Sequence, residues 1–133
     1  LERIIAMLAT EIIKEKKGFC HMNPIKEEEI KKAEKELGTI FSDEYKEILS
    51  EYGVISCFGH EITGICKFKR LNVVDVTLKE RQNNSNVENL YVLEKTNIDD
   101  IIIWQDSKGY VYQTKASGKP IKICNSIIEY LSD

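Results

Sequence analysis

The sequence is poor in the residues that mark linkers, disulfide frameworks and membrane spans. Only two of its 133 residues are proline and seven are glycine, which argues against long linkers and low-complexity segments. No apolar run approaches the roughly 20 residues that a membrane-spanning helix needs. The hydrophobic and charged fractions, 42% and 31%, are typical of a folded globular protein. We therefore expect one domain over residues 1–133, with no membrane association.

Cysteine usage argues against a secreted, disulfide-bonded protein. The four cysteines, Cys20, Cys57, Cys66 and Cys124, form no C-x-x-C pair. The first 17 residues carry charges that neither a signal-peptide core nor a transit peptide would contain. We expect a cytoplasmic protein with free thiols. Cys57, His60 and Cys66 are three possible zinc ligands without a fourth nearby, and buried free cysteines are the more ordinary interpretation. We predict no metal site.

A basic excess is also missing. The net charge is −3, whereas a nucleic-acid binder usually carries positive charge to neutralise phosphates. The charge is nevertheless uneven: residues 24–53 contain nine acids against five lysines, and residues 64–81 contain five basic residues against two acids. Solvated helix faces would explain this pattern. The sharper interpretation is an acidic surface that faces a basic partner.

The first half of the chain is predicted to be helical. Apolar residues recur at helical spacing at the N-terminus, and Gly18 is the predicted end of this helix. The residues are Leu1, Ile4, Ile5, Leu8, Ile12 and Ile13. This stripe is expected to pack on the core of the domain, although a partner-binding helix would look similar. Asn23-Pro24 is a typical helix start, and Gly38 a typical end. Ser42 is predicted to cap another helix that ends at Gly53.

From residue 54 onward the pattern favours short strands. The predicted strands lie between polar or glycine breaks, at residues 54–58, 61–68, 90–93, 101–104, 110–114 and 120–123. Asp106-Ser107-Lys108-Gly109 is predicted to be a hairpin turn, and Ser126 to open a short final helix. Residues 72–81 are ambiguous between strand and helix. The predicted fold class is α+β: N-terminal helices, then a mostly antiparallel, twisted β-sheet and a short C-terminal helix.

Several motifs occur in a fixed order along this pattern. The helical part reads Glu34-x-x-Leu37-Gly38-x-x-Phe41-Ser42-x-x-Tyr45-Lys46-x-x-Leu49-x-x-Tyr52-Gly53. It is followed by Gly59-x-Glu61-Ile62-x-Gly64 and by Val73-Val74-x-x-Thr77-x-x-x-Arg81. In this order the motifs resemble the SUKH superfamily, in its YobK-type branch of bacterial immunity proteins, over residues 25–131. Ser42 stands where that branch usually has proline. The resemblance favours a helix over residues 72–81.

The resemblance implies a protein that is not an enzyme and needs no cofactor. Such immunity proteins bind and neutralise the toxins of polymorphic or contact-dependent systems, often nucleases, inside the cell. Other branches are regulatory or scaffold modules, so a non-toxin protein-binding module is the alternative. The residues agree with binding, since the chain has neither a G-x-S-x-G motif nor a phosphate-binding glycine loop. Adjacent side chains diverge, so Cys20-His21 is not a nucleophile–base pair.

The candidate partner-binding residues are aromatic and charged side chains of the second half of the chain, because tyrosine, tryptophan and arginine anchor interfaces. They are Glu61, Asp75, Glu80, Arg81, Trp104, Asp106, Tyr110 and Tyr112. Trp104 follows three isoleucines, which favours a core or groove position. The expected mechanism is occlusion of a toxin's basic cleft by carboxylates. No nucleic-acid partner is expected, and an exposed edge strand would support a homodimer.

Overall fold

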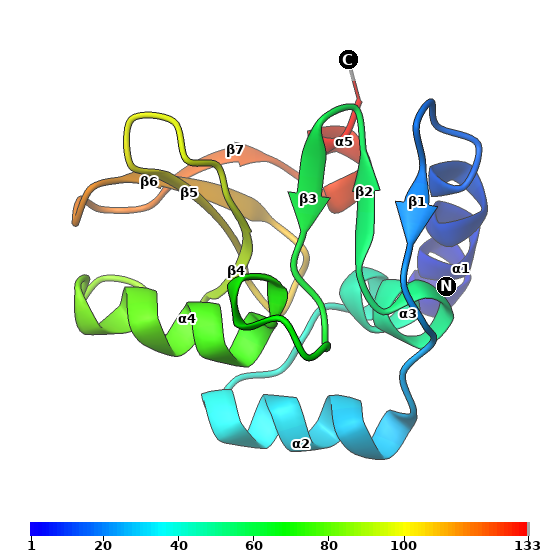
Figure 1. Ribbon diagram of the computed structural model, residues 1–133, viewed down its shortest axis with the longest axis horizontal. Coiled ribbons are helices and arrows are strands. Elements are labelled where there is room, and N and C mark those ends of the chain that lie inside the picture. Colours follow the sequence, from blue (N-terminus) through cyan, green and yellow to red (C-terminus); the bar gives the residue numbers. More distant parts are fainter. Residues whose placement is uncertain (133) are drawn as a thin grey trace.

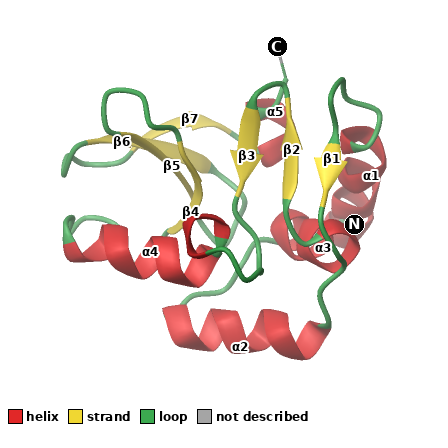
Figure 2. Cartoon of the chain, viewed as in Figure 1, coloured by secondary structure: helices red, strands yellow, loops and turns green. Residues whose placement is uncertain are grey.

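The computed structural model describes residues 1–132 as an α+β fold, which confirms the predicted class (Figure 1). The helices are α1 (Glu2–Ile13), α2 (Glu27–Leu37), α3 (Asp43–Tyr52), α4 (Val73–Gln82), α5 (Ile127–Tyr130) and the 3₁₀ turn η1 (Lys69–Leu71). The strands are β1 (Cys20–His21), β2 (Ile55–Cys57), β3 (His60–Ile62), β4 (Tyr91–Lys95), β5 (Ile101–Gln105), β6 (Val111–Lys115) and β7 (Ile121–Cys124). In the view of Figure 2, helices α2, α3 and α4 lie below the strands.

Most of the predicted helix ends are confirmed, but the predicted end at Gly18 is wrong, because α1 already ends at Ile13. Ser42 caps α3, since the Tyr45 N–H donates to its Oγ at 3.0 Å, and Gly38 ends α2 in the left-handed conformation at φ 64°. The predicted start at Asn23 is wrong, because α2 begins only after Lys26, whose side chain makes no capping bond. Residues 72–81 are helical, as the resemblance implies, and Asn72 Oδ1 accepts from the Val74 N–H at 3.0 Å.

The strands form two antiparallel sheets, in the orders β1-β2-β3 and β4-β5-β6-β7. The Thr63 N–H donates to the Leu93 carbonyl at 2.7 Å, and this bond links the two sheets. The predicted strand over residues 61–68 ends early at Ile62. The chain leaves the sheet there because Gly64 bonds instead to the segment around η1, with its N–H on the Leu71 carbonyl. The short strand β1 was not predicted.

Two apolar clusters fill the two sides of the larger sheet. The first is built around Phe41, Tyr45 and Tyr91, whose ring centroids lie 4.8 to 5.1 Å apart, and it joins α2, α3 and α5 to the strands. The second lies under α4 and contains Trp104. Alternate residues of β4 and β5 enter the two clusters, so both faces of these strands are buried.

Of the six apolar residues of the N-terminal stripe that were expected to pack on the core, Ile13 does so, and the expectation is wrong for the other five. Helix α1 turns Ala6, Ala9, Thr10 and Ile13 inward. It lies against α3, where the Tyr52 hydroxyl donates to the Thr10 carbonyl at 3.0 Å. Small side chains allow this approach. The large aliphatic residues project about a quarter-turn or more away from that inner row, and they are exposed: Leu1, Ile4, Ile5, Leu8 and Ile12.

Candidate interaction surface

The structure divides the predicted partner-binding residues among three places. Asp75 and Glu80 line a groove of about 370 Å³ beside α4, together with Val76 and four basic residues, Lys69, Arg70, Lys79 and Lys95. We call it the α4 groove. Glu61 lies next to it, paired with Arg70 at 3.1 Å, and Glu80 pairs with Lys95 at 3.4 Å. The carboxylates here are therefore largely neutralised by their own chain, and the groove lining carries more positive than negative charge.

Two of the predicted anchors make their contacts within the fold: Trp104 is buried and Arg81 is half-buried. Trp104 is 1% exposed, and its Nε1–H donates to Thr114 Oγ1 at 2.9 Å. Arg81 donates to the Leu37 carbonyl at 2.6 Å and to the Leu90 carbonyl at 2.9 Å. These bonds tie the end of α2 to the start of β4, and desolvation lowers the pKa of Arg81. Neither side chain is presented to a partner on this surface.

The third group, Asp106, Tyr110 and Tyr112, gathers at the β5–β6 turn. Asp106 Oδ1 accepts from the Tyr110 N–H at 3.0 Å, and its Oδ2 accepts from the Tyr112 hydroxyl at 2.9 Å. Burial is the largest cause of the raised pKa of Tyr112, and the hydrogen bond to Asp106 adds to it. Tyr110 is 38% exposed, with Lys122 Nζ 3.9 Å from its ring centroid. Tyr110 is thus the available aromatic anchor, held by a rigid turn.

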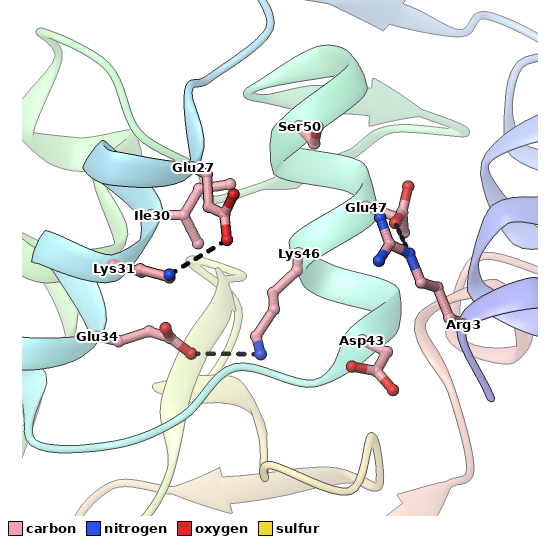
Figure 3. Close-up of a pocket in the computed structure, with 9 residues that line it drawn as sticks. All are labelled: Arg3, Glu27, Ile30, Lys31, Glu34, Asp43, Lys46, Glu47 and Ser50. Atoms are coloured by element: carbon pink, nitrogen blue, oxygen red, sulfur yellow. Dashed lines mark ion pairs between the residues drawn. The ribbon is translucent and has the colours of Figure 1, made fainter.

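The acidic helical segment forms a second groove, of about 330 Å³, between α2 and α3 (Figure 3). Its carboxylates alternate with basic side chains. The ion pairs drawn there are Lys31–Glu27 at 3.2 Å, Lys46–Glu34 at 3.8 Å and Arg3–Glu47 at 3.8 Å. Lys31–Glu27 is exposed on both sides and contributes little to stability, whereas Glu34 and Glu47 are only 16% and 20% exposed. Charged side chains of a partner could replace an exposed ion pair such as Lys31–Glu27 with little loss of stability.

Glu44 contributes no charge to that surface. Its carboxylate accepts from the Ile127 N–H at 2.7 Å and from the Ile128 N–H at 3.1 Å. It also accepts from Gln105 Nε2 at 3.2 Å. Burial raises the pKa of Glu44, and these hydrogen bonds oppose the rise. Glu44 therefore joins α3 to the start of α5 and to the larger sheet.

A buried polar cluster that the sequence did not predict lies around Glu94. Its Oε1 accepts from the Tyr130 hydroxyl at 2.5 Å and lies 2.8 Å from His60 Nδ1, while its Oε2 accepts from the Glu61 N–H at 2.8 Å. Burial and then Glu94 raise the pKa of Tyr130. In the sequence this cluster could have been suspected from Glu94, an acid that follows the apolar residues of β4. The cluster ties the β2–β3 hairpin to β4 and α5.

In the part of the chain that the structure describes, neither a reactive thiol nor a metal centre accompanies this cluster. Cys57 is the cross-strand partner of His60, but burial raises the pKa of its thiol and disfavours the reactive thiolate. Cys66 lies beyond β3 and donates to the Phe68 carbonyl. Among the side chains described, no three of His, Cys, Asp or Glu gather as a metal site would require. Within residues 1–132, no helix is long and apolar enough to cross a membrane.

An exposed apolar surface lies on α1, where Leu1, Ile4, Ile5, Leu8 and Ile12 are all exposed. A groove of about 460 Å³ runs between α1 and the β5–β6 turn. It is lined on one side by Ile5, Ala6 and Ala9 and on the other by Lys108, Gly109 and Tyr110, among others. The sequence pattern identified the stripe of α1. It could not identify which face of the helix would be covered, because that depends on the position of α3.

Comparison with known proteins identifies the family. The SUKH_6 family model, described as SMI1-KNR4 cell-wall, matches residues 27–131. This range contains α2 to α5 and both sheets except β1. A search of curated proteins found no match. Because the match covers most of the sequence, the chain belongs to the SMI1-KNR4 family of the SUKH superfamily.

Proposed function

We propose that this chain is an immunity protein of the YobK-type branch, which binds a cognate polymorphic or contact-dependent toxin and occludes its active site. The observation that carries the proposal is the family match over residues 27–131. The ordered motifs of the same region, from Glu34 to Arg81, support the branch. The proposed activity is binding in the cytoplasm without a cofactor, and the proposed toxin chemistry is nucleic-acid cleavage.

The charge of α2 and α3 supports a basic partner, but less strongly than the sequence suggests. Of the nine acids in residues 24–53, Glu44 is turned inward and three others pair with basic side chains. Five are exposed and make no ion pair with a described side chain: Glu28, Glu29, Glu36, Asp43 and Glu51. Three lysines of the segment are in the same position, namely Lys26, Lys32 and Lys35. The exposed and unpaired side chains of this segment therefore carry a net charge of −2, whereas the count over the sequence is −4.

Such an acidic surface would chiefly increase the rate of association with the toxin. A nuclease presents a positive cleft to phosphates, and exposed carboxylates accelerate encounter with that cleft more than they raise final affinity. Pairs such as Glu61–Arg70, already formed in the free protein, would exchange partners on binding. Tyr110 and the β5–β6 turn offer the rigid aromatic contact that a stable complex needs.

The test is binding to the toxin encoded beside the gene, measured over a range of salt concentrations. We expect association that slows as salt rises. The double variant Glu29→Lys/Glu36→Lys should slow association by about ten-fold at low salt. The matched control Glu15→Lys/Glu88→Lys makes the same charge change at exposed positions outside the segment and should leave association close to that of the unmodified protein. Absence of binding would reject the immunity role for that pair, and salt-independent binding would reject the electrostatic part.

A second candidate is a regulatory or scaffold module that binds a protein other than a toxin. It is favoured by the description of the matched family, which refers to the cell wall. Gene neighbourhood separates the two proposals, since an immunity gene lies next to a toxin gene. A chain without a neighbouring toxin that still forms a stable complex with a cellular protein would support the scaffold role.

A further inference from the structure

The outward face of α1 presents a continuous aliphatic row. We define the α1 face as Leu1, Ile4, Ile5, Leu8 and Ile12, which are between 53% and 90% exposed. Figure 1 shows α1 at one edge of the molecule, far from α4. A monomeric protein seldom leaves so many neighbouring large aliphatic side chains in water. The α1 face also precedes residues 27–131, so it lies outside the part of the chain that the family model matches.

The spacing of this row is that of a helix which pairs with another helix. Leu1, Ile5, Leu8 and Ile12 follow one another at intervals of four, three and four residues. This is the alternation of the two core positions of a coiled coil, with leucine at one position and isoleucine at the other. Isoleucine and leucine in this arrangement favour two-stranded association. The inner row of α1, by contrast, consists mainly of small residues.

The exposed area of the chain is consistent with a missing partner. Its accessible surface is 7949 Å², whereas a folded monomer of 15.3 kDa is expected to expose about 7,100 Å². The difference is about 800 Å², similar in size to what each partner buries in a standard interface, and the exposed side chains of the α1 face contribute to it.

The chemistry of the face selects the partner. All five residues are aliphatic, so the face offers nothing to the basic cleft of a nuclease. Glu11, beside the row, is paired with Lys14 of the same chain. A second copy of α1 is complementary in both shape and polarity, because identical rows interleave across a two-fold axis. We infer that the α1 face joins two copies of this chain into a homodimer. This inference does not rest on the proposed toxin binding.

Sedimentation and light scattering of the full chain test the dimer. Over concentrations from about 1 to 200 µM, we expect the mass to rise from 15.3 kDa to twice that value. Leu8→Glu places a charge in the centre of the row and should leave the protein monomeric throughout, with unchanged helical circular dichroism. Ile98→Glu is the matched control, since Ile98 is 63% exposed in the β4–β5 loop, and it should dimerise like the unmodified chain.

Three results would overturn the inference. They are an unmodified chain that stays monomeric over the whole range, a dimer that persists in Leu8→Glu, and a control Ile98→Glu that loses the dimer equally. The first of these needs no variant, so a poorly folded Leu8→Glu would not block the test. Loss of toxin binding with an intact dimer would count only against the proposed immunity role.

Discussion

At the scale of single residues, Glu44 shows how an acid that looks like surface charge in the sequence becomes a structural ligand. It lies in the first turn of α3, where an acid is ordinary. Its two oxygens accept from the first backbone N–H groups of α5, some 80 residues later in the chain. These N–H groups have no partner inside their own helix. The carboxylate therefore acts as a cap supplied from a distance.

Replacing Glu44 should loosen α5. Glu44→Ala leaves the Ile127 and Ile128 N–H groups without their acceptor, and we expect the free energy of unfolding to fall by about 2 kcal/mol. Amide exchange at Ile127 and Ile128 should accelerate. Asp43→Ala removes an exposed neighbouring acid and serves as the control, with a change of about 0.5 kcal/mol or less. Equal effects of the two substitutions would contradict the capping role.

Glu44 also gives the protein a pH dependence of defined sign. Burial raises its pKa in the folded protein above the ordinary value of 4.5. The folded protein therefore binds this proton more tightly than the unfolded chain. The resulting stability is complete below pH 4.5 and is lost as the pH rises through the higher folded pKa. In urea unfolding between pH 4 and 7, Glu44→Ala should lack this decline; an unchanged pH profile would show that another group is responsible.

The bonds of Glu94 should be energetically coupled. Tyr130→Phe removes one donor to a buried carboxylate and should lower the free energy of unfolding by about 2 kcal/mol. Glu94→Ala leaves the Tyr130 hydroxyl and the Glu61 N–H without an acceptor and should cost about 3 kcal/mol. The double variant should cost no more than Glu94→Ala alone. Denaturation that shows additive losses would mean that the two groups do not interact.

At the scale of elements, helix ends were the most predictable feature. Ser42 and Ser126 cap their helices through local bonds to N–H groups three residues away, so the sequence carries the whole interaction. The start at Asn23 failed for the opposite reason. Residues 23–26 are held by distant partners: the Ile25 N–H donates to the Leu49 carbonyl at 3.0 Å, and a local pattern cannot report such a contact.

Gly64, the last residue of the family hairpin motif, is required where two backbone segments meet. A Cβ added there would collide with the Gly53 carbonyl oxygen and would lie 2.9 Å from Val54 Cγ2. Gly64→Ala should therefore lower the free energy of unfolding by about 4 kcal/mol or more. At Gly38 an added Cβ would meet no atom within 4 Å. Gly38→Ala should therefore lower the free energy of unfolding by only about 1 kcal/mol, the cost of placing alanine in the left-handed conformation at φ 64°. Chemical denaturation compares the two, and equal losses would exclude the collision.

At the scale of the whole molecule, α1 should behave as a separate unit of stability. Its inner row of mostly small residues buries little apolar surface against α3, so local opening should be easy. In hydrogen exchange at low protein concentration, we expect residues 2–13 to exchange faster than β5. At high concentration, dimerisation should slow exchange in α1 and leave β5 unchanged. Protection of α1 that does not vary with concentration would contradict the proposed dimer.

The candidate site was less predictable than the fold, because it depends on which side of each element faces the solvent. Their residue types led to the prediction that Trp104 and Arg81 are interface anchors. In the structure Trp104 is buried and Arg81 donates to a backbone carbonyl of the same chain. The turn over Asp106–Gly109 was predicted correctly, since a turn is local, and it places the Asp106 carboxylate on the Tyr110 N–H. The acids of residues 24–53 were counted correctly, but their pairing with Arg3 and with α5 joins parts far apart in the chain.

The sequence by itself determined the fold class, most helix ends, the β5–β6 turn and, through its ordered motifs, the superfamily. All of these depend on residues within a few positions of one another. Only the tertiary structure decided which groups were exposed: it turned Glu44 inward, gathered His60 and Tyr130 on Glu94, and left the α1 face in water. The physical reason is that burial results from packing between distant segments, whereas the period of an amphipathic helix is the same whether its partner is its own core or a second copy of the chain.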